Sequence, residues 1–331
     1  MGVLRTKSIE QSIQDTEESE HRLKKDLSAM DLTVFGIGVI IGTGIFVLTG
    51  IAAATKAGPA VSLSFVLAGV ACALAALCYA EFASTVPVAG SAYTFSYASL
   101  GEIIAWIIGW DLVLEFALGA SAVAVGWAQY FASVFPIPES ISGEGSVNLA
   151  AGAIVLLLTA VTILGVKLSS RFNAVMVAIK LAVVLLFIGA GAVKITASNW
   201  SPFIPPPAEA PKAANAVETG SPLIQVLFGI EPLSFGWLGI AFGAAIVFFA
   251  FIGFDVVATT AEETRNPQRD MPFGILGSLA ICTLLYVVVS LVLTGMVKYT
   301  ELNTAAPWPT PSRRSATTGS PAWCRWGRWP G

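Results

Sequence analysis

The chain has 331 residues, of which 55% are hydrophobic and 12% charged, and its formal net charge is −3. Soluble globular domains are roughly 25% charged, so this composition excludes an ordinary soluble domain and indicates an integral membrane protein. The single histidine, His21 in the polar N-terminal tail, argues against a Ser-His-Asp hydrolase and against a histidine-based metal site.

The first 30 residues are polar, carry charges of both signs and lack the apolar core of a signal peptide. Seven apolar segments follow, each longer than the ~18 residues that mark a candidate membrane-spanning helix. Charges interrupt two of them, with Asp111 and Glu115 in the third and Lys180 in the fifth. In chain order the predicted spans are 32–55, 57–80, 103–135, 148–166, 172–193, 232–254 and 271–297.

The charges of the connecting segments predict that the N-terminus, residues 1–30, lies in the cytoplasm, because Lys and Arg concentrate in cytoplasmic loops. The Pro- and Ala-rich connection 197–231 is then extracellular, and Pro267 should stop any helix that enters from the sixth span. With this orientation the inner side holds Arg5, Lys7, Arg22, Lys24, Lys25, Lys167, Arg171, Arg265 and Arg269, and the outer side holds Lys56, Lys194, Lys212 and Lys298.

The final segment, 308–331, differs in composition from the rest of the chain. It holds four tryptophans and four arginines and contains no Leu, Ile, Val, Phe, Lys, Asp or Glu. Such a segment forms neither an eighth span nor a packed core. It is either a basic, aromatic interfacial tail or the product of out-of-frame translation after about Pro307, and we favour the frameshift. Sequencing of the locus, to see whether a downstream frame encodes further apolar spans, distinguishes the two.

Glycines interrupt the first and sixth spans at their middle, in the segments VIIGTGIF (39–46) and FFAFIGFD (248–255). Glycine costs roughly 1 kcal/mol relative to alanine in a helix interior. At 1.5 Å per residue both breaks lie roughly 18 Å into their spans, as Glu115 does, and Lys180 lies roughly 13 Å into its span. These groups therefore converge near the centre of a hydrocarbon core roughly 30 Å thick.

Two structural explanations compete with a functional one. Glu115 and Lys180 can form an ion pair, and glycines in membrane helices often permit close helix packing. A helix broken inside a membrane, however, is tolerated only against protein or a water-filled cavity. The half that starts at the break directs its positive end at the cavity, and the preceding half presents carbonyls. Together the two breaks predict a receptor for a carboxylate beside an ammonium, as in a zwitterionic amino acid.

Five segments in order resemble the amino acid–polyamine–organocation superfamily, and most closely its bacterial cationic amino acid transporter branch. The resemblance covers about 23–307 and implies an all-α polytopic membrane protein with the leucine-transporter fold. In that fold two five-helix repeats are inverted relative to each other, and helices one and six are unwound. The segments are DLTVFGIGVIIGTGIFVLTG, PVAGSAYTFSY, GWDLVLEFALG, SSRFNAVMVAIKLAVVLLF and FFAFIGFDVVATTAEETRNPQRDMP.

The resemblance implies a substrate site built from both breaks. Amides of the first break hold the substrate carboxylate, carbonyls beside both breaks hold its ammonium, and aromatic rings of the second break close over it. The implied residues are Gly42, Thr43 and Gly44 for the carboxylate, Ile40, Phe249, Ala250 and Ile252 for the ammonium, and Phe251, Gly253 and Phe254 for the rest of the pocket, with both phenylalanines closing over the substrate.

The resemblance also implies the coupling ion. Lys180 matches a fifth-helix lysine that stands where sodium binds in sodium-coupled relatives, so the proton is the implied coupling ion, with no other cofactor and no metal. Burial disfavours the charged form of an ammonium, which allows this lysine to gain and lose a proton near neutral pH. Glu115 matches an acidic third-helix position near the Thr43 end of the site, where it would gate or line the pocket.

The predicted function is a secondary active amino acid permease of the bacterial plasma membrane, working by proton-coupled alternating access. Its expected partners are the amino acid and the lipid bilayer; we expect no nucleic-acid partner and no enzyme activity. The resemblance implies twelve spans, whereas this sequence holds the first repeat (31–196) and only the start of the second (232–298). We therefore expect truncation to impair transport unless a complementing fragment or a small membrane partner is present. The alternatives are a non-transporting amino acid sensor and a seven-helix retinal-type receptor with Lys180 as its Schiff base.

Overall fold

The structure is a computed structural model of the chain and describes residues 25–135, 148–163, 170–209 and 233–302, together with Ile13 and Leu23. These residues are mainly helical, with turns and short connections between the helices. They include one antiparallel pairing of two residues each, β1 (Ala208–Glu209) with β2 (Leu233–Ser234), and an isolated parallel bridge between Leu27 and Thr264. Most of the predicted N-terminal tail and all of the segment 308–331 lie outside the described residues, as does the greater part of the predicted outer loop 197–231.

Every predicted span contains helix in the described part of the chain. The first is interrupted: α2 (Ala29–Ile40) is followed after a break by η1 (Gly44–Leu48), α3 (Thr49–Ala52) and η2 (Ala53–Ala57). The sixth is interrupted as well, into α11 (Gly236–Phe248) with η5 (Phe249–Phe251) and, after a turn, η6 (Val256–Glu263). The remaining elements are η3 (Gly58–Ala60), α4 (Val61–Thr85), α5 (Ser91–Ser99), α6 (Glu102–Val134), α8 (Leu149–Ile163), α9 (Ser170–Ala192), η4 (Ala197–Trp200), α12 (Pro267–Met296) and η7 (Tyr299–Glu301).

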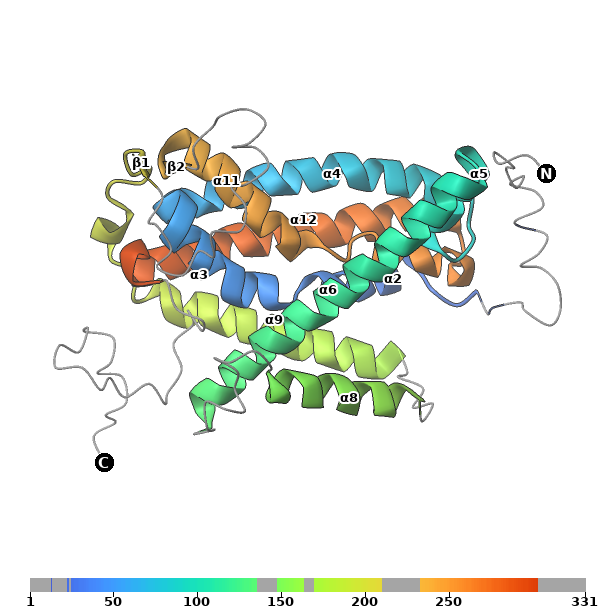
Figure 1. Cartoon of the computed structure of the whole chain (residues 1–331), viewed down its shortest axis with the longest axis horizontal. Helices are drawn as coiled ribbons and strands as arrows, with labels where there is room; N and C mark the ends of the chain where they lie inside the picture. Colours follow the sequence, from blue (N-terminus) through green and yellow to red (C-terminus); the bar gives the residue numbers. More distant parts are fainter. Residues whose placement is uncertain are drawn as a thin grey trace.

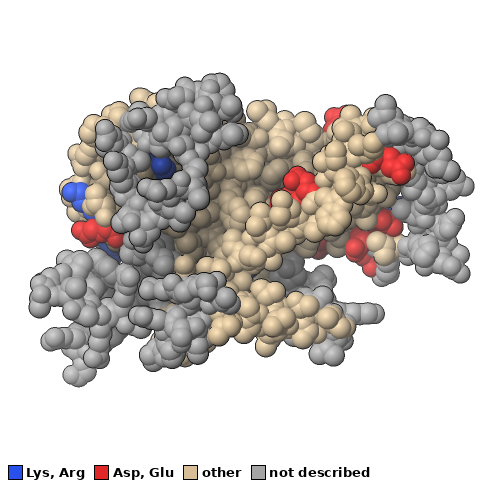
Figure 2. All heavy atoms as spheres, viewed as in Figure 1, with Lys and Arg blue, Asp and Glu red and all other residues tan. Residues whose placement is uncertain are grey.

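The helices have the length and composition of a polytopic membrane protein. Five helical runs in the described residues are long and apolar enough to cross a membrane, and α2 and the segment Leu149–Ala160 are shorter apolar helices. On the face that Figure 2 shows, the described charged side chains gather mainly toward the two ends of the long axis, and a band with few charges lies between them. The chain is therefore an integral membrane protein.

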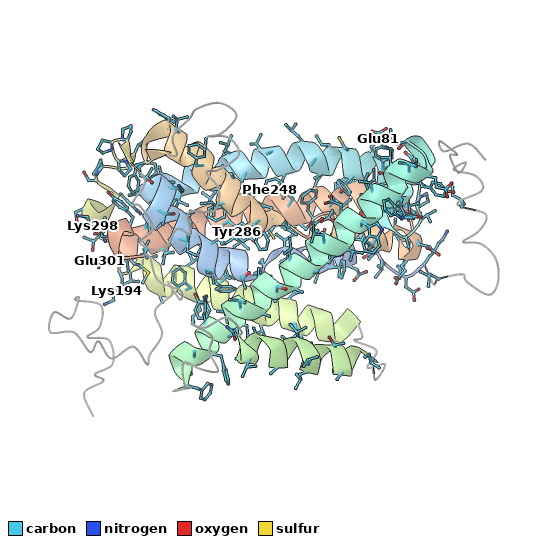
Figure 3. All side chains as sticks on the ribbon, viewed as in Figure 1. Glu81, Lys194, Phe248, Tyr286, Lys298 and Glu301 are labelled. Atoms are coloured by element: carbon cyan, nitrogen blue, oxygen red, sulfur yellow. The ribbon has the colours of Figure 1, made fainter. Side chains whose placement is uncertain are left out.

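The helices run roughly along the long axis of the molecule, and successive spans run in opposite directions (Figure 1). We call the two ends the α5 end and the β end, after the elements found there. α12 packs against α4, α2 and α9, α11 packs against α4, and α6 crosses the others obliquely and packs against α5 and α8. Figure 3 shows Glu81 at the α5 end, Lys194, Lys298 and Glu301 at the β end, and Tyr286 midway between them. The Tyr286 hydroxyl donates to a carbonyl in each of the two interrupted spans, so these spans meet near the middle of the apolar band.

Three aromatic rings form the centre of the core. Phe65 of α4, Phe251 of η5 and Tyr286 of α12 are each less than 2% exposed. Their ring centroids lie 6.2 Å (Phe65–Phe251), 5.4 Å (Phe65–Tyr286) and 5.2 Å (Phe251–Tyr286) apart, within the range of favourable aromatic pairs. Because lipid tails are as apolar as these side chains, close packing and hydrogen bonds hold such helices together. This cluster fixes the second break against α4 and α12.

At the β end the halves of the two interrupted spans are joined to each other. Ser234 Oγ donates to the Thr55 carbonyl at 2.7 Å, and the Phe235 amide donates to the Lys56 carbonyl at 2.6 Å. The start of the predicted outer loop is bound to α12, because Asn199 Nδ2 donates to the Gly295 carbonyl at 2.8 Å. The β-end halves of the first and sixth spans are thus held as one unit.

At the α5 end the chain that leads into α2 is bound to the segment that follows η6. The Leu27 amide donates to the Glu263 carbonyl, and the Arg265 amide donates to the Leu27 carbonyl, both at 3.0 Å. Ser28 and Asp31 form a capping box that satisfies two backbone amides at the start of α2. Pro267 is the first residue of α12, where its missing amide proton removes no helical hydrogen bond. The prediction that a helix from the sixth span ends before Pro267 is confirmed.

Candidate functional site

The first break begins where α2 ends, at Ile40. Ile41 adopts extended backbone with φ −73° and ψ 99°, and the chain becomes regular again only with the π-type turn η1, which starts at Gly44. A Cβ atom on Gly42 would meet no atom within 4 Å, whereas one on Gly44 would collide with Ala250 of the second break. The predicted break around Gly42–Gly44 is confirmed, and its two glycines differ: Gly44 permits contact between the breaks, and Gly42 faces open space.

The second break lies between η5 and η6. Ile252 has φ −52° and ψ 133°, and Gly253 has φ +113°, a backbone conformation that residues with side chains rarely adopt. A Cβ atom on Gly253 would also lie 2.6 Å from Val39 Cγ1 at the end of α2. The predicted break in the sixth span is therefore confirmed, and the two breaks lie in direct contact.

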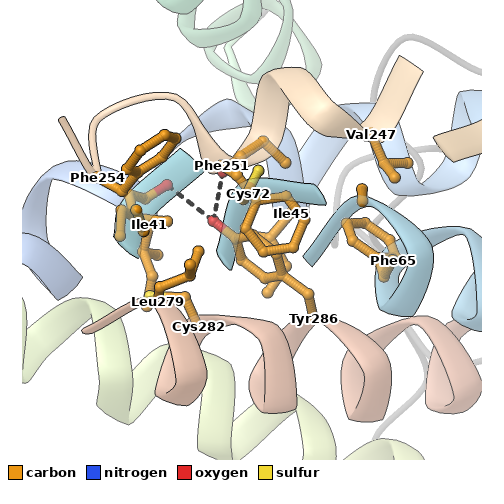
Figure 4. Close-up of a cluster of buried hydrophobic side chains, with 14 of the residues drawn as sticks. Ile41, Ile45, Phe65, Cys72, Val247, Phe251, Phe254, Leu279, Cys282 and Tyr286 are labelled. Atoms are coloured by element: carbon orange, nitrogen blue, oxygen red, sulfur yellow. Dashed lines mark hydrogen bonds between the residues drawn. The ribbon is translucent and has the colours of Figure 1, made fainter. Parts of the chain in front are cut away.

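The Tyr286 hydroxyl bridges the two breaks. It lies 2.8 Å from the Ile40 carbonyl oxygen and 2.9 Å from the Ala250 carbonyl oxygen (Figure 4). One proton is shared between two acceptors, which makes this a three-centre hydrogen bond. These are two of the carbonyls predicted to hold an ammonium, so in this structure a phenol from α12 occupies them. Sequence reasoning missed Tyr286, although a lone tyrosine in an apolar span needs a partner for its hydroxyl.

Lys180 of α9 binds the end of α2. Its Nζ atom donates to the Gly38 carbonyl at 2.8 Å and to the Ile41 carbonyl at 3.1 Å. The last carbonyls of a helix lack partners within the helix and carry its negative partial charge, so an ammonium is well placed there. In the described part of the chain Lys180 binds these carbonyls and not Glu115, which argues against the ion-pair explanation.

Glu115 is half-buried on α6. It lies farther from Thr43 than the sequence predicts. The residue of α6 that faces Thr43 is Gly126, where a Cβ atom would lie 2.8 Å from Thr43 Cγ2. Glu115 comes eleven residues earlier, roughly 16 Å along the helix toward the α5 end. There it lies within electrostatic reach of Asp255 and Tyr79. The structure therefore places Glu115 on the η6 side of the site.

The aromatic residues of the second break have different environments. Phe254 is 7% exposed, and its ring packs edge-on against Tyr79 of α4 with centroids 5.7 Å apart. Phe251 is fully buried in the core cluster, so its ring is occupied in packing. The Phe249 carbonyl accepts from the Ile252 amide at 3.3 Å within η5. Phe254 is therefore the better placed of the two phenylalanines to cover a ligand.

Comparison with known families decides what kind of protein this is. Residues 27–316 match the family described as amino acid permease. The chain belongs to the amino acid permease family. This confirms the resemblance to the superfamily and the prediction that the chain is not an enzyme, because the relatives of this chain are transporters. Neither the sensor nor the retinal-type receptor gains support.

The relatives of this chain are named for different substrates. It is 49% identical over 296 residues to the methylthioribose transporter of Bacillus subtilis (strain 168), covering 86% of this chain and 58% of that protein. It is 47% identical over 313 residues to the branched-chain amino acid permease BcaP of the same organism, covering 91% and 61%. It is 38% identical over 316 residues to the vacuolar cationic amino acid transporter 4 of Arabidopsis thaliana, covering 92% and 49%. The chain spans about half to three fifths of the length of these relatives.

Proposed function

We propose that this chain carries the substrate site of a secondary active permease that moves a zwitterionic amino acid across the membrane by alternating access. The observation that carries the proposal is the contact between two interrupted helices in the middle of the apolar band. Helix ends turned toward one point offer amides and carbonyls that lipid cannot satisfy. Such ends suit a small ligand that carries both a carboxylate and an ammonium.

The carboxylate is assigned to the amides at the first break. The half-helix that starts near Gly44 directs its positive end at the break, and the position of a Cβ atom on Gly42 lies in open space. The ammonium is assigned to the Ile40 and Ala250 carbonyls. Because a carbonyl oxygen has two lone pairs, these atoms can hold the Tyr286 hydroxyl and an ammonium together.

Proton coupling is assigned to Lys180. A protonated ammonium makes stronger hydrogen bonds to the Gly38 and Ile41 carbonyls than a neutral amine would. Loss of the proton therefore loosens the end of α2 next to the substrate carboxylate. By the positive-inside argument the α5 end faces the cytoplasm, and the bacterial relatives support a plasma-membrane location.

Three substrate classes follow from the names of the relatives: branched-chain amino acids, cationic amino acids and methylthioribose. A site with a helix N-terminus and carbonyls side by side favours an amino acid, because methylthioribose has neither a carboxylate nor an ammonium. The test is binding and uptake of labelled leucine, arginine and methylthioribose by the chain in nanodiscs and in proteoliposomes. We expect saturable binding of an amino acid, displaced by an unlabelled amino acid and not by methylthioribose. Binding of methylthioribose alone would overturn the assignment of an amino acid as the substrate.

The two glycines of the first break provide a paired prediction. Gly44→Ala should lower the thermal midpoint by several degrees, because overpacking against Ala250 costs roughly 1–3 kcal/mol. Gly42→Ala should leave the midpoint unchanged and weaken amino acid binding at least tenfold, because its methyl group enters the space through which the carboxylate approaches. Scanning fluorimetry and a binding assay on both variants check this, and normal binding by Gly42→Ala would contradict the assignment of the carboxylate.

A further inference from the structure

The start of α5 has an uncommon backbone conformation. Gly90 has φ +113° and Ser91 has φ +49°, so a residue with a side chain occupies the left-handed region directly after a glycine. A residue other than glycine costs roughly 1–2 kcal/mol in this region, and it persists where its surroundings hold it in place. Ser91 is 3% exposed, so the contacts that hold it are internal.

The side chain of Ser91 makes its hydrogen bond with the second break. Ser91 Oγ donates to the main-chain carbonyl of Asp255 at 3.2 Å, across 164 positions of sequence. The same carbonyl accepts from the Ala258 amide at 3.0 Å, which closes the first turn of η6. The Asp255 carboxylate in turn accepts from the Gly253 amide at 3.2 Å. Asp255 therefore joins the turn at Gly253 to the start of η6, and Ser91 holds Asp255.

A chain of aromatic rings connects α5 with the same break. The Phe95 ring of α5 packs edge-on against Tyr79 with centroids 6.3 Å apart, and Tyr79 packs edge-on against Phe254 with centroids 5.7 Å apart. Just before α5, the Ala89 amide donates to Glu262 Oε2 at the far end of η6, at 3.3 Å. The segment from Ala89 to Phe95 thus contacts both the start and the end of η6. It also reaches Phe254 through the ring of Tyr79.

We propose that Ser91 is a positioning residue for the second break. Its hydroxyl fixes the Asp255 carbonyl, which sets the first turn of η6 and, through the adjoining residue, the place of the Phe254 ring over the substrate site. The strained backbone at Ser91 is retained because it aims the hydroxyl at this carbonyl. The effect on the break is a property of the fold alone, and the effect on ligand binding rests on the proposed permease function.

Two variants of Ser91 separate positioning from ordinary stability. Ser91→Ala removes the hydroxyl and keeps the strained backbone, whereas Ser91→Gly removes the hydroxyl and relieves the strain. The matched control is Ser99→Ala in the same helix, because Ser99 Oγ donates to the Phe95 carbonyl at 2.7 Å, within α5 itself. Ser91→Gly should therefore melt at or above the temperature of Ser91→Ala, which provides a folded variant that lacks the hydroxyl.

The first measurement is amide hydrogen exchange of the peptide 252–263, with the full chain in nanodiscs. Loss of one hydrogen bond should speed exchange of this peptide about fivefold in both Ser91 variants and leave it unchanged in Ser99→Ala. Unchanged exchange in the Ser91 variants would overturn the proposal, whatever the chain binds. Restoration of slow exchange by Ser91→Gly would overturn it as well, because backbone strain and not the hydroxyl would then matter.

The second measurement is the Kd for labelled leucine, or for arginine if only that binds. We expect Kd to rise about tenfold in both Ser91 variants and to stay unchanged in Ser99→Ala. The rise should occur in Ser91→Gly even though its melting temperature is preserved. If Ser91 had only a structural role, the affinity of the chain for the amino acid would fall only in the variants whose melting temperature also falls. If the parent chain binds no amino acid and exchange still accelerates in the Ser91 variants, the positioning role stands and the proposed function fails.

Discussion

Lys180→Met should abolish uptake driven by a pH gradient, with a loss of at least a hundredfold. Methionine has nearly the length of lysine but neither a proton to exchange nor a donor for the Gly38 and Ile41 carbonyls, which Lys180 holds at 2.8 and 3.1 Å. A buried carbonyl left without a partner costs roughly 1–3 kcal/mol, so the end of α2 should also loosen. Uptake of labelled amino acid into proteoliposomes, with and without an imposed pH gradient, measures the loss of proton-driven transport.

A lysine outside the site provides the control for this prediction. Lys194 is exposed at the β end, and Lys194→Met removes the same charge without touching either break (Figure 3). It should transport as the parent does at every pH. Full uptake by Lys180→Met with an unchanged pH dependence would rule out the coupling role and leave this lysine as a partner for the end of a helix.

The positions of the two breaks could be predicted from the sequence because glycine is costly inside a membrane helix. VIIGTGIF and FFAFIGFD weaken two helices at similar depth, and the structure interrupts both there, with Gly253 at positive φ and Gly44 against Ala250. The seven apolar segments follow from the length that a bilayer demands. These features depend on short stretches of the sequence, so the sequence alone is sufficient to predict them.

The partners of single polar side chains could not be predicted in the same way. Which carbonyls Lys180 and Tyr286 reach depends on how α9 and α12 are rotated and placed against α2, which hydropathy does not encode. The pairing of Ser91 with Asp255, 164 residues away, depends on tertiary packing for the same reason. Glu115 shows the limit of depth counting, because α6 is oblique and 33 residues long, so similar depth does not place Glu115 beside Thr43.

Tyr286→Phe tests whether the bridge between the breaks serves transport. The change removes one oxygen and keeps a ring that packs at 5.4 Å from Phe65 and 5.2 Å from Phe251, so the core should survive with a small fall in melting temperature. The Ile40 and Ala250 carbonyls then lose the donor that holds them together, and we expect turnover to fall at least tenfold and amino acid Kd to rise about fivefold.

A tyrosine at the β end is the matched control for Tyr286→Phe. Tyr299→Phe should change neither turnover nor Kd, because its ring packs on Phe235 and its neighbours Lys298 and Glu301 lie at the β end, away from both breaks (Figure 3). Tighter amino acid binding by Tyr286→Phe would contradict the bridging role, because it would show that the hydroxyl competes with the substrate ammonium for the two carbonyls. The binding constant therefore decides between a phenol that aligns these carbonyls for the ligand and one that must leave before the ligand binds.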